Sequence, residues 1–599
     1  MELADFVALA AVFAFAFVGG YIAQRMRQPV MVGFIVAGVA LGTIAAAWSP
    51  LGDALFRDVG VRQLSRPVQA VFDLGITFLM FFTGMEISIH RLSRAGRAAT
   101  ILALADTGLG FLIGGLVGVL FGWSWTDIFF LGGIIVMSSL SVAARSLIEL
   151  RRLDNRETEF LLSAMVAETF ISMVLLTLST SLIVVGGGSG PSRDMAEMGL
   201  AVAFVYVTLI ALAVLVVPRL ARGMAAIRHE EVFILLALTM IFSAAALSWA
   251  FGLPFMIGAF FMGVAFSETA LTDRLRVRLM SLKDAFVAAF FVGFGALINL
   301  GLLIEGEVAL MVAVTIPLIV FYETVLTSTV SFLMGLVRRE ALKLGTAFLG
   351  RAEDAVMFAS VGGRLKDEAG RAALPHGSSL YPFAGGVSLV MSVLTPKLMK
   401  LSAPIADTLA SAMPAWLRFG ATLVQRVLSI ELWPEPLRSR RSLAFAATTL
   451  AFLACVLALI ATFRGDDALE RLGLVAVAFA IWASHAAVMR SAFRAIGPSL
   501  DLTGLNLLTR DREMLTDHVS YMLSTLLLIP LLVASAFPIG AWAALAAPAA
   551  VLPVVLALSR SVHRKAVEPP HGMSGLAMLD AEAKADGKSL QRGRGGGPG

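Results

Sequence analysis

Cysteine is almost absent from this chain of 599 residues. The only one, Cys455, lies in an apolar run, so the chain can form neither an internal disulfide nor a cysteine-based metal cluster. Charged residues are also scarce, at 15% of the sequence, whereas hydrophobic residues make up 58% and the mean hydropathy is +0.85. These values exclude an ordinary soluble protein and predict an all-α polytopic membrane protein.

Other absences narrow the function. The net charge of +5 does not indicate a nucleic-acid partner, because the basic residues are scattered over short loops. The first apolar run begins at Ala4 with no basic flank or cleavage site before it, and we expect a retained span. No G-x-G-x-x-G motif follows residue 402, so no nucleotide-binding domain is expected there. We expect no cofactor, no bound metal and no enzymatic activity.

Apolar runs of about 20 residues predict helices that cross the lipid bilayer. Thirteen such runs precede residue 402, and four more follow it. The first thirteen are 4–23, 29–47, 68–87, 99–121, 127–148, 158–185, 197–217, 231–250, 252–270, 284–304, 308–336, 343–363 and 380–401. The last four are 443–463, 472–489, 519–536 and 539–559.

The positions of these runs divide the chain into four parts. Residues 1–402 form a first membrane domain, and residues 403–442, which contain four prolines and the string RSRR, form a cytoplasmic linker. Residues 443–562 form a four-span membrane module of unknown role, suited to oligomerisation, partner binding or a second activity. Residues 563–599 lack apolar periodicity and are predicted to be a disordered cytoplasmic tail.

Basic loops alternate along the first domain. Arginines gather in every second loop, at residues 25–27, 91–97, 151–156, 219–228, 274–278 and 338–343. Loops rich in Lys and Arg remain in the cytoplasm. The N-terminus is therefore expected outside the cell and the C-terminus inside.

Carboxylates occur inside or at the rim of several apolar runs. A charge in hydrocarbon costs at least about 2.5–3.5 kcal/mol, so such side chains face a water-filled cavity or a partner. They are Asp73, Glu86, Asp106, Glu168, Glu323, Glu353 and Asp354. We interpret Asp73 and Glu86, close to the rims, as structural. The others predict a membrane transporter that handles a small cation.

Two segments differ from an ordinary transmembrane helix. In residues 138–150, SSLSVAARSLIEL, the serines at 138, 139 and 141 lie midway along a span, and residues 350–354, GRAED, place three charges within another. Hydroxyl groups can satisfy the backbone groups that a broken helix exposes. Broken helices line the ion sites of transporters built from inverted repeats, so both segments are predicted to be helix breaks.

Seven strings in this sequence resemble, in the same order, those of the second branch of the monovalent cation:proton antiporter superfamily. That branch includes bacterial sodium/proton exchangers and glutathione-gated potassium efflux proteins, and the resemblance covers about the first two-thirds of the chain. The strings are PVMVGFIVAGVALG, FDLGITFLMFFTGMEI, SSLSVAARSL, AMVAETFISMVLL, GLPFMIGAFFMGVAFSE, SLKDAFVAAFFVGFGALINLGLL and GRAEDAVMFASVGG.

The resemblance implies thirteen spans with an inverted repeat, a dimerisation part that gives a homodimer, and a mobile core. In that core two broken helices would cross, here those of Ser138 to Ser141 and Gly350 to Asp354. It also implies exchange of protons for Na⁺ or K⁺ across the inner membrane of a bacterium.

Two positions depart from the family pattern. Members typically carry an aspartate in the sixth span, where this chain has Thr169 after Glu168. Many carry a lysine or arginine in the eleventh span, where this chain has Glu323 and Thr324. The resemblance therefore implies a site with two glutamates and two threonines that has lost the internal cation.

These residue types suit competition between a proton and a cation. Carboxylate and hydroxyl oxygens, including those of Ser138 and Ser139, are hard ligands for Na⁺ or K⁺. Burial and like-charge repulsion favour a protonated carboxyl, so one glutamate is expected to hold a proton until a cation displaces it. Arg351 and Glu353 are expected to neutralise each other or the helix dipoles at the break, with Asp354 as a further supporting charge.

The leading hypothesis is a proton-coupled antiporter of monovalent cations that works by alternating access, with Glu168 as the central acceptor. Two alternatives stay open. The first is a transporter of the same fold with another substrate, such as a divalent cation, which the extra Glu323 favours. The second is a membrane scaffold or sensor that does not transport and whose function lies in the last four spans.

Overall fold

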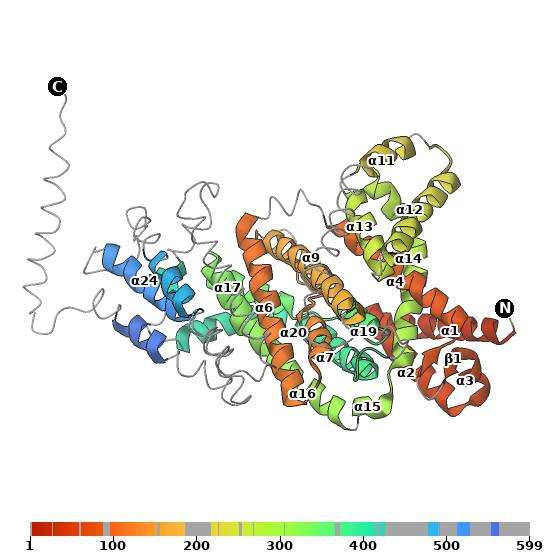
Figure 1. The fold of residues 1–599 in the computed structure, drawn as a ribbon, viewed down its shortest axis with the longest axis horizontal. Coiled ribbons are helices and arrows are strands. Elements are labelled where there is room, and N and C mark those ends of the chain that lie inside the picture. Colours follow the sequence, from red (N-terminus) through yellow and green to blue (C-terminus); the bar gives the residue numbers. More distant parts are fainter. Residues whose placement is uncertain are drawn as a thin grey trace, which may run out of the picture. The chain divides into compact units, whose positions relative to one another are not determined.

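The structure is a computed structural model of the whole chain, drawn in Figure 1. It comprises two compact units, Met1–Asp407 and Thr408–Gly599. The residues whose structure is described are 3–26, 28–58, 62–87, 96–152, 156–185, 217–225, 227–250, 254–267, 269–304, 306–365, 372–412, 414, 416, 419, 421–425, 477, 479–488, 490, 512–526 and 553–561.

The first unit is built almost entirely from helices, which confirms the prediction of an all-α polytopic membrane protein. Ten helical segments in the described residues are long and apolar enough to cross a membrane. Among the described residues, the one pair of strands is a short antiparallel pair, β1 (Phe56–Asp58) and β2 (Gln63–Leu64). These strands follow the short helix α3 (Ser49–Leu55).

Three of the thirteen predicted spans are not among the ten. Span 252–270 is the shorter helix α13 (Phe255–Ser267), and span 343–363 is interrupted. Span 197–217 lies outside the described residues except for Val217, where α11 (Val217–Ala225) begins.

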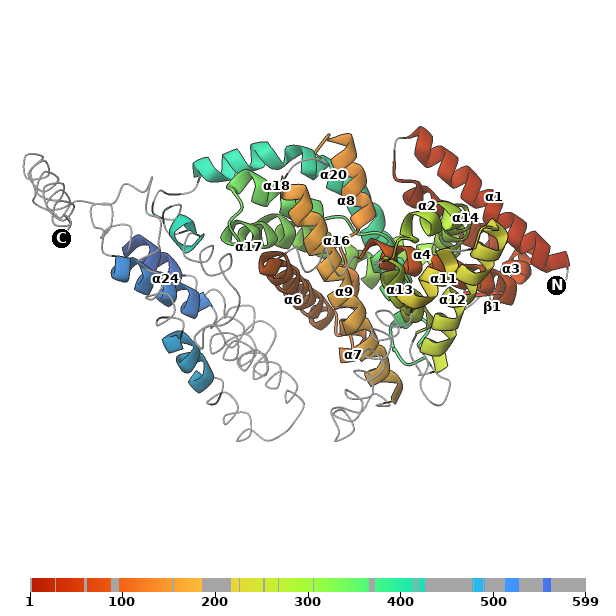
Figure 2. The ribbon, with the colours of Figure 1, turned by 90° about the horizontal axis from the view of Figure 1, so that it is seen from above.

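One group of helices forms a bundle around α4 (Arg66–Glu86). In it α4 packs against α13 and α14 (Thr272–Leu297), α14 packs against α2 (Val30–Ala47), and α2 packs against α1 (Leu3–Arg25). Helix α12 (Glu230–Ala250) packs against α13. We call these six helices the first bundle; they lie together on one side of the unit in Figure 2.

Glycine allows very close helix contacts in the first bundle. A Cβ atom added at Gly38 of α2 would lie 2.2 Å from the carbonyl oxygen of Val292 and 2.9 Å from the Cα of Gly295, both in α14. The backbones of α2 and α14 therefore touch, as small residues permit in membrane helix packing.

A second bundle surrounds two broken helices. The first broken helix consists of α7 (Trp125–Val136) and α8 (Leu140–Glu149), and the second of α18 (Arg338–Phe348) and α19 (Glu353–Gly362). Around them lie α6 (Gly96–Leu120), α9 (Arg156–Val185), α16 (Glu307–Phe321) and α17 (Ser328–Leu333). Helix α7 packs against α6, α9 and α19, and α18 packs against α9 and α17.

The two helix breaks meet at the centre of the second bundle. The amide of Ser139 donates a hydrogen bond of 2.7 Å to the carbonyl oxygen of Gly350. Each break thus satisfies a backbone group that the other exposes. The prediction that broken helices at Ser138–Ser141 and Gly350–Asp354 come together is confirmed.

A π-helical turn, η2 (Tyr322–Thr327), separates α16 from α17. Such turns contain one residue more than an α-helical turn and occur frequently at functional sites. It holds Glu323, Thr324 and Thr327, and Pro317 lies inside α16 one turn before it.

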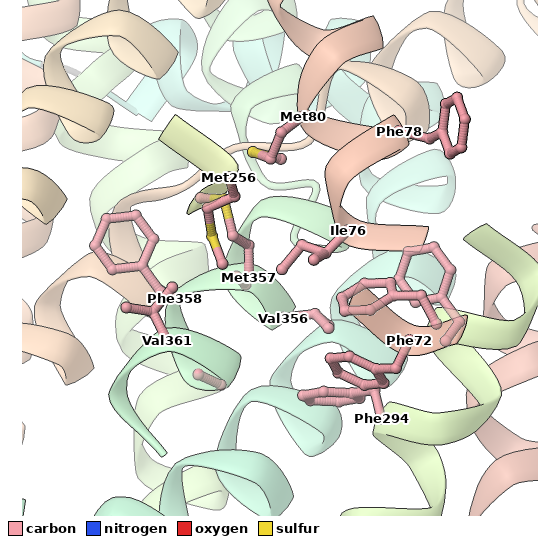
Figure 3. Close-up of a cluster of buried hydrophobic side chains, with 14 of the residues drawn as sticks. Phe72, Ile76, Phe78, Met80, Met256, Phe294, Val356, Met357, Phe358 and Val361 are labelled. Atoms are coloured by element: carbon pink, nitrogen blue, oxygen red, sulfur yellow. The ribbon is translucent and has the colours of Figure 1, made fainter. Parts of the chain in front are cut away.

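The two bundles meet through an apolar contact. Figure 3 shows Ile76 of α4 and Met256 of α13 beside Val356 and Met357 of α19. All four side chains are buried in one continuous hydrophobic cluster. Short helices α15 (Leu300–Ile304) and η3 (Gly377–Ser379) complete the unit together with the long helix α20 (Leu380–Ala412).

Helix α20 continues past residue 402, where the sequence predicts the linker to begin, and ends at Ala412 although it contains Pro396 and Pro404. In the second unit, α24 (Arg512–Leu526) and the helix Phe479–Val488 are described. These cover parts of the predicted spans 519–536 and 472–489. The predicted span 443–463 and the tail 563–599 lie outside the described residues.

Candidate ion-binding site

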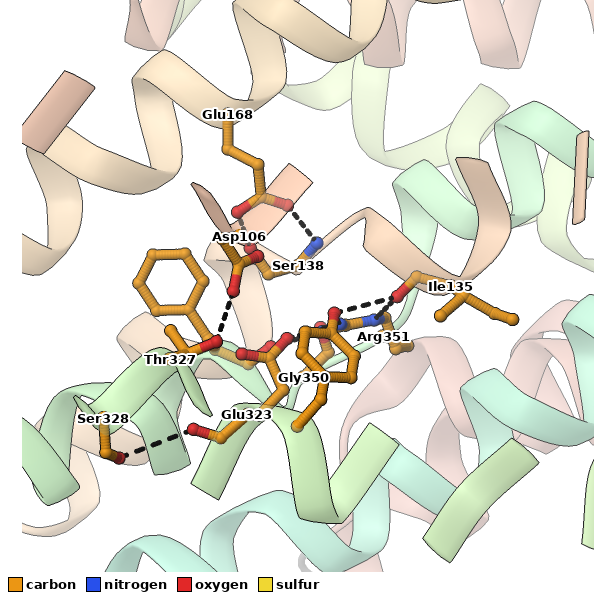
Figure 4. Close-up of polar contacts among 11 residues, drawn as sticks. Asp106, Ile135, Ser138, Glu168, Glu323, Thr327, Ser328, Gly350 and Arg351 are labelled. Carbon is orange, nitrogen blue, oxygen red and sulfur yellow. Dashed lines mark hydrogen bonds and ion pairs between the residues drawn. The ribbon is translucent and has the colours of Figure 1, made fainter. Parts of the chain in front are cut away.

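Glu168 of α9 lies at the first helix break. Its Oε1 accepts a hydrogen bond of 2.8 Å from the amide of Ser138, and its Oε2 accepts one from the Ser138 hydroxyl. The amide is free to donate because α7 ends at Val136, and the side chain of Glu168 is only 1% exposed. The structure therefore brings together the predicted residues Glu168 and Ser138 (Figure 4).

Thr169, the next residue along α9, is buried as well. Its hydroxyl donates a hydrogen bond of 3.0 Å to the carbonyl oxygen of Met165 in the same helix. This bond uses the hydroxyl proton and leaves oxygen lone pairs, so Thr169 can offer a ligand only as an acceptor.

Glu323 of η2 forms a fully buried ion pair. Its Oε1 lies 2.5 Å from Nη2 of Arg351, and neither side chain is exposed. Arg351 also donates to the carbonyl oxygens of Ile135, Phe348 and Gly350 and to the hydroxyl of Tyr322. The guanidinium thus joins both helix breaks to the π-helical turn (Figure 4).

This arrangement decides between two expectations for Arg351 and corrects a third. Arg351 pairs with Glu323 and not with Glu353. Its hydrogen bonds to carbonyl oxygens at the ends of α7 and α18, and the place of Glu353 in the first turn of α19, agree with the expectation that both charges face the helix dipoles at the break. The site also keeps an internal cation, which Arg351 supplies from the second helix break.

Glu353 opens α19 and faces the first break. Its Oε2 accepts hydrogen bonds of 2.9 Å from the hydroxyls of both Ser139 and Ser141. The neighbouring Asp354 is 3% exposed, and its Oδ1 has no hydrogen-bond partner among the described residues. Both carboxylates lie in the first turn of α19, where the helix dipole favours negative charge.

Asp106 and Thr327 also belong to this polar cluster, although the sequence does not assign them to the site. The Thr327 hydroxyl donates a hydrogen bond of 2.5 Å to Oδ1 of Asp106, which lies on α6. The signal in the sequence is a lone carboxylate midway along the fourth predicted span. That signal places Asp106 in the membrane but does not identify its neighbours.

Several oxygens in the cluster remain available to a ligand. Within the described part of the chain, Oε2 of Glu323, Oγ1 of Thr324 and Oδ2 of Asp106 have no hydrogen-bond partner. Buried polar atoms are normally paired, so unpaired ones at the meeting point of broken helices indicate a functional site. Hard oxygens of this kind suit Na⁺, K⁺ and the proton.

The chain is also similar to known proteins. Residues 13–400 match the family described as sodium/hydrogen exchanger, transmembrane. The K(+)/H(+) antiporter subunit KhtU of Bacillus subtilis is 27% identical over 387 residues, which cover 64% of this chain and 90% of that protein. The Na(+)/H(+)-K(+) antiporter GerN of Bacillus cereus is 24% identical over 363 residues, which cover 60% of this chain and 89% of that protein.

A solved structure is also similar. It is the structure of the sodium proton antiporter MjNhaP1 of Methanocaldococcus jannaschii at pH 8. The alignment covers 72% of this chain and 100% of that chain, with 16% sequence identity and a TM-score of 0.45.

Proposed function

Because the chain belongs to the sodium/hydrogen exchanger family, we propose that it is a secondary active transporter that exchanges protons for Na⁺ or K⁺ by alternating access. The relatives named above are antiporters of potassium, or of sodium and potassium, with protons. The proposal accordingly assigns the protein transport and no enzymatic activity.

The observation that carries the proposal is the position of Glu168 against the break at Ser138. A protonated Glu168 is neutral in the buried site. An ionised Glu168 needs a counter-charge, and Arg351 is already bound to Glu323. A cation from solution supplies that charge, so the proton and the cation compete for one carboxylate. Ser138, Ser139, Thr169 and Thr324 contribute oxygen ligands around it.

Proteoliposomes that contain the purified protein and a pH-sensitive dye test this function. Addition of NaCl or KCl should dissipate an imposed pH gradient, and Glu168→Gln should abolish the response. Glu149→Gln, at an exposed glutamate of α8, is the matched control and should behave as wild type. A Glu168→Gln protein that exchanges at the wild-type rate would overturn the assignment.

The same vesicles separate the alternatives. LiCl and CaCl₂ are added in turn, and a response to CaCl₂ without one to the monovalent salts would favour a divalent-cation transporter. No response of folded protein to any salt would favour a scaffold or sensor.

We further propose the thirteen-span inverted repeat for residues 1–402. The two broken helices correspond to the fifth and twelfth predicted spans. They are seven spans apart, so they would cross the membrane in opposite directions. An inverted repeat produces that relation, and it would explain why the breaks meet.

The remaining organisation is also proposed. The alternation of basic loops supports an external N-terminus and a cytoplasmic C-terminus in a bacterial inner membrane. The first bundle, with its close helix contacts, would form the rigid part through which two copies make a homodimer. Residues 403–442 would link this domain to a four-span module at 443–562, followed by the cytoplasmic tail 563–599.

A further inference from the structure

Asp354 is a buried carboxylate that has no role in the proposed exchange at Glu168. It lies in the first turn of α19 and is 3% exposed. Its Oδ1 has no hydrogen-bond partner in the described residues, whereas the neighbouring Glu353 accepts hydrogen bonds from two serine hydroxyls. Buried polar atoms are normally paired, so an unpaired carboxylate oxygen indicates a site for a ligand.

The titratable groups around Asp354 are acidic. Within the described part of the chain, those that interact with it electrostatically are Glu353, Glu168 and Glu86. Glu168 is the central acceptor of the proposed exchange, and Glu86 is the last residue of α4, where its side chain is exposed. Asp354 is therefore within electrostatic reach of both the buried acceptor and an exposed carboxylate.

The apolar contact between the two bundles determines the side from which Asp354 is reached. Met357, one helical turn after Asp354 on the same face of α19, lies in that contact beside Ile76 and Met256 (Figure 3). Glu86 lies about 15 Å further along α4 than Ile76, at 1.5 Å per residue. In the orientation proposed above, that end of α4 faces the cytoplasm. Asp354 is accordingly reached from the cytoplasmic side of the contact.

Two basic side chains of α14 balance part of the charge of Glu86. Arg276 and Lys283 interact with Glu86 electrostatically. Lys283 is also paired with Asp284 at 3.2 Å and lies over the ring of Phe82. A carboxylate whose charge is partly balanced attracts a cation from solution but does not bind it tightly. A cation drawn to Glu86 can therefore move on to the deeper carboxylate.

We propose that Asp354 is an intermediate cation site through which Na⁺ or K⁺ from the cytoplasm reaches Glu168, with Glu86 as the group that attracts the cation. Before the cation arrives, Asp354 and Glu168 are both protonated and neutral. The cation replaces the proton of Asp354, and that proton leaves to the cytoplasm. The cation then moves to Glu168, and the Glu168 proton moves to Asp354. One proton is released for each cation bound, and no step leaves an unpaired charge in the buried site.

This inference rests on the proposed function, because it requires a proton and a cation to compete at Glu168. It adds a property that Glu168 alone does not produce, which is a difference between the two sides of the membrane. Cations that enter from the outer side in the alternate state do not pass Asp354. Loss of its carboxylate should therefore weaken the apparent affinity for cytoplasmic cations only.

Membrane vesicles of the two orientations test this difference. Inside-out and right-side-out vesicles that contain the full-length protein receive NaCl or KCl, whichever supports exchange, and a pH dye reports proton movement. In inside-out vesicles, Asp354→Asn should raise the cation concentration that gives half of the maximal rate about tenfold, which corresponds to ~1.4 kcal/mol of cation binding. In right-side-out vesicles, this concentration should equal the wild-type value.

Glu149→Gln is the matched control. It removes a carboxylate from the end of the other broken helix, at a side chain that is 53% exposed, and should behave as wild type in both orientations. Glu86→Gln is a second test variant, because a substitution at an exposed helix end should not disturb folding. It should raise the half-maximal concentration in inside-out vesicles about threefold, and this effect should disappear in ~0.5 M choline chloride, which screens exposed charges.

The outcomes separate the two proposals. No response of wild-type vesicles in either orientation would overturn the proposed function itself. A folded Asp354→Asn protein that keeps the wild-type half-maximal concentration in inside-out vesicles would overturn only the role of Asp354. An equal rise in both orientations would do the same, since Asp354 would then belong to the central site. If Asp354→Asn does not fold, Glu86→Gln decides, and an unchanged half-maximal concentration in inside-out vesicles overturns the inference.

Discussion

Arg364, just beyond the end of α19, lies 2.5 Å from the carboxylate of Asp73 in α4 and so joins the two bundles with an ion pair. The guanidinium carbon of Arg364 also lies over the ring of Phe72, 4.3 Å from its centroid. Gln69 donates to the same carboxylate from one helical turn away. The two bundles are therefore joined by an ion pair in addition to their apolar contact.

The ion pair between Arg364 and Asp73 is expected to contribute little to the stability of the protein. Both side chains are about one-third exposed, at 29% and 35%, so the pair should contribute no more than about 1 kcal/mol. Arg364→Gln and Asp73→Asn should each lower the thermal midpoint slightly, and the double variant should be no worse than either single one. Thermal unfolding in detergent measures the three variants. Additive losses would show that the two side chains do not interact.

Substitutions in the buried pair of Glu323 and Arg351 should lower the stability of the protein much more than substitutions of Asp73 or Arg364. Glu323→Gln leaves the guanidinium without its counter-ion, which is expected to cost about 3–5 kcal/mol of apparent stability. Glu323→Lys would place a second cation against Arg351 and should be worse. The double variant Glu323→Leu/Arg351→Met should be more stable than either single variant. Arg145→Gln, in an exposed pair on α8, is the control and should change stability by less than about 0.5 kcal/mol.

Gly38→Ala should separate two helices of the first bundle. The new Cβ would meet the backbone of α14 at 2.2 Å, and backbone cannot rotate away, so we expect a loss of about 1–3 kcal/mol. Gly115→Ala, where nothing lies within 4 Å, should be neutral or slightly stabilising because alanine favours helix. Equal melting temperatures for the two variants would contradict the close contact of α2 with α14.

Truncation after Ala412 should leave a folded protein that still exchanges. This end point retains the whole of α20 and the first compact unit, with all residues of the candidate site. Gel filtration and the vesicle assay measure the outcome. A truncated protein that folds but has lost exchange would assign the C-terminal module a part in transport or its control.

The sequence predicts much of the site through local signals. Ser138 and Gly350 stand in strings whose serines and charges disrupt a membrane helix, and Glu168 is the carboxylate of its span. The meeting of these residues follows because broken helices expose backbone groups that need partners. The close approach at Gly38 is likewise visible in a glycine-rich string.

Other features depend on tertiary structure. The string GRAED places Arg351 and Glu353 two residues apart, which suggests a mutual pair, but a long guanidinium at a helix break can turn toward any neighbouring element. The packing of η2 against both breaks places Glu323 beside the guanidinium, so Arg351 pairs with Glu323. The π-helical turn itself is an extra residue in a helix and leaves no periodic trace over so short a length. Asp106 joins the site only through that turn.

The contact between the two breaks also bears on how the protein is made. Ser139 and Glu353 are bonded to each other although 214 residues separate them in the chain. During synthesis, the helices that carry Asp106, Ser138 and Glu168 enter the membrane long before Arg351 exists. Until Arg351 is made, the carboxylates of Asp106 and Glu168 have no cationic side chain of the site nearby, and they are most stable in the membrane as neutral acids. Completion of the site is a late step in biogenesis, and premature release of the chain would leave a half-built polar core in the lipid.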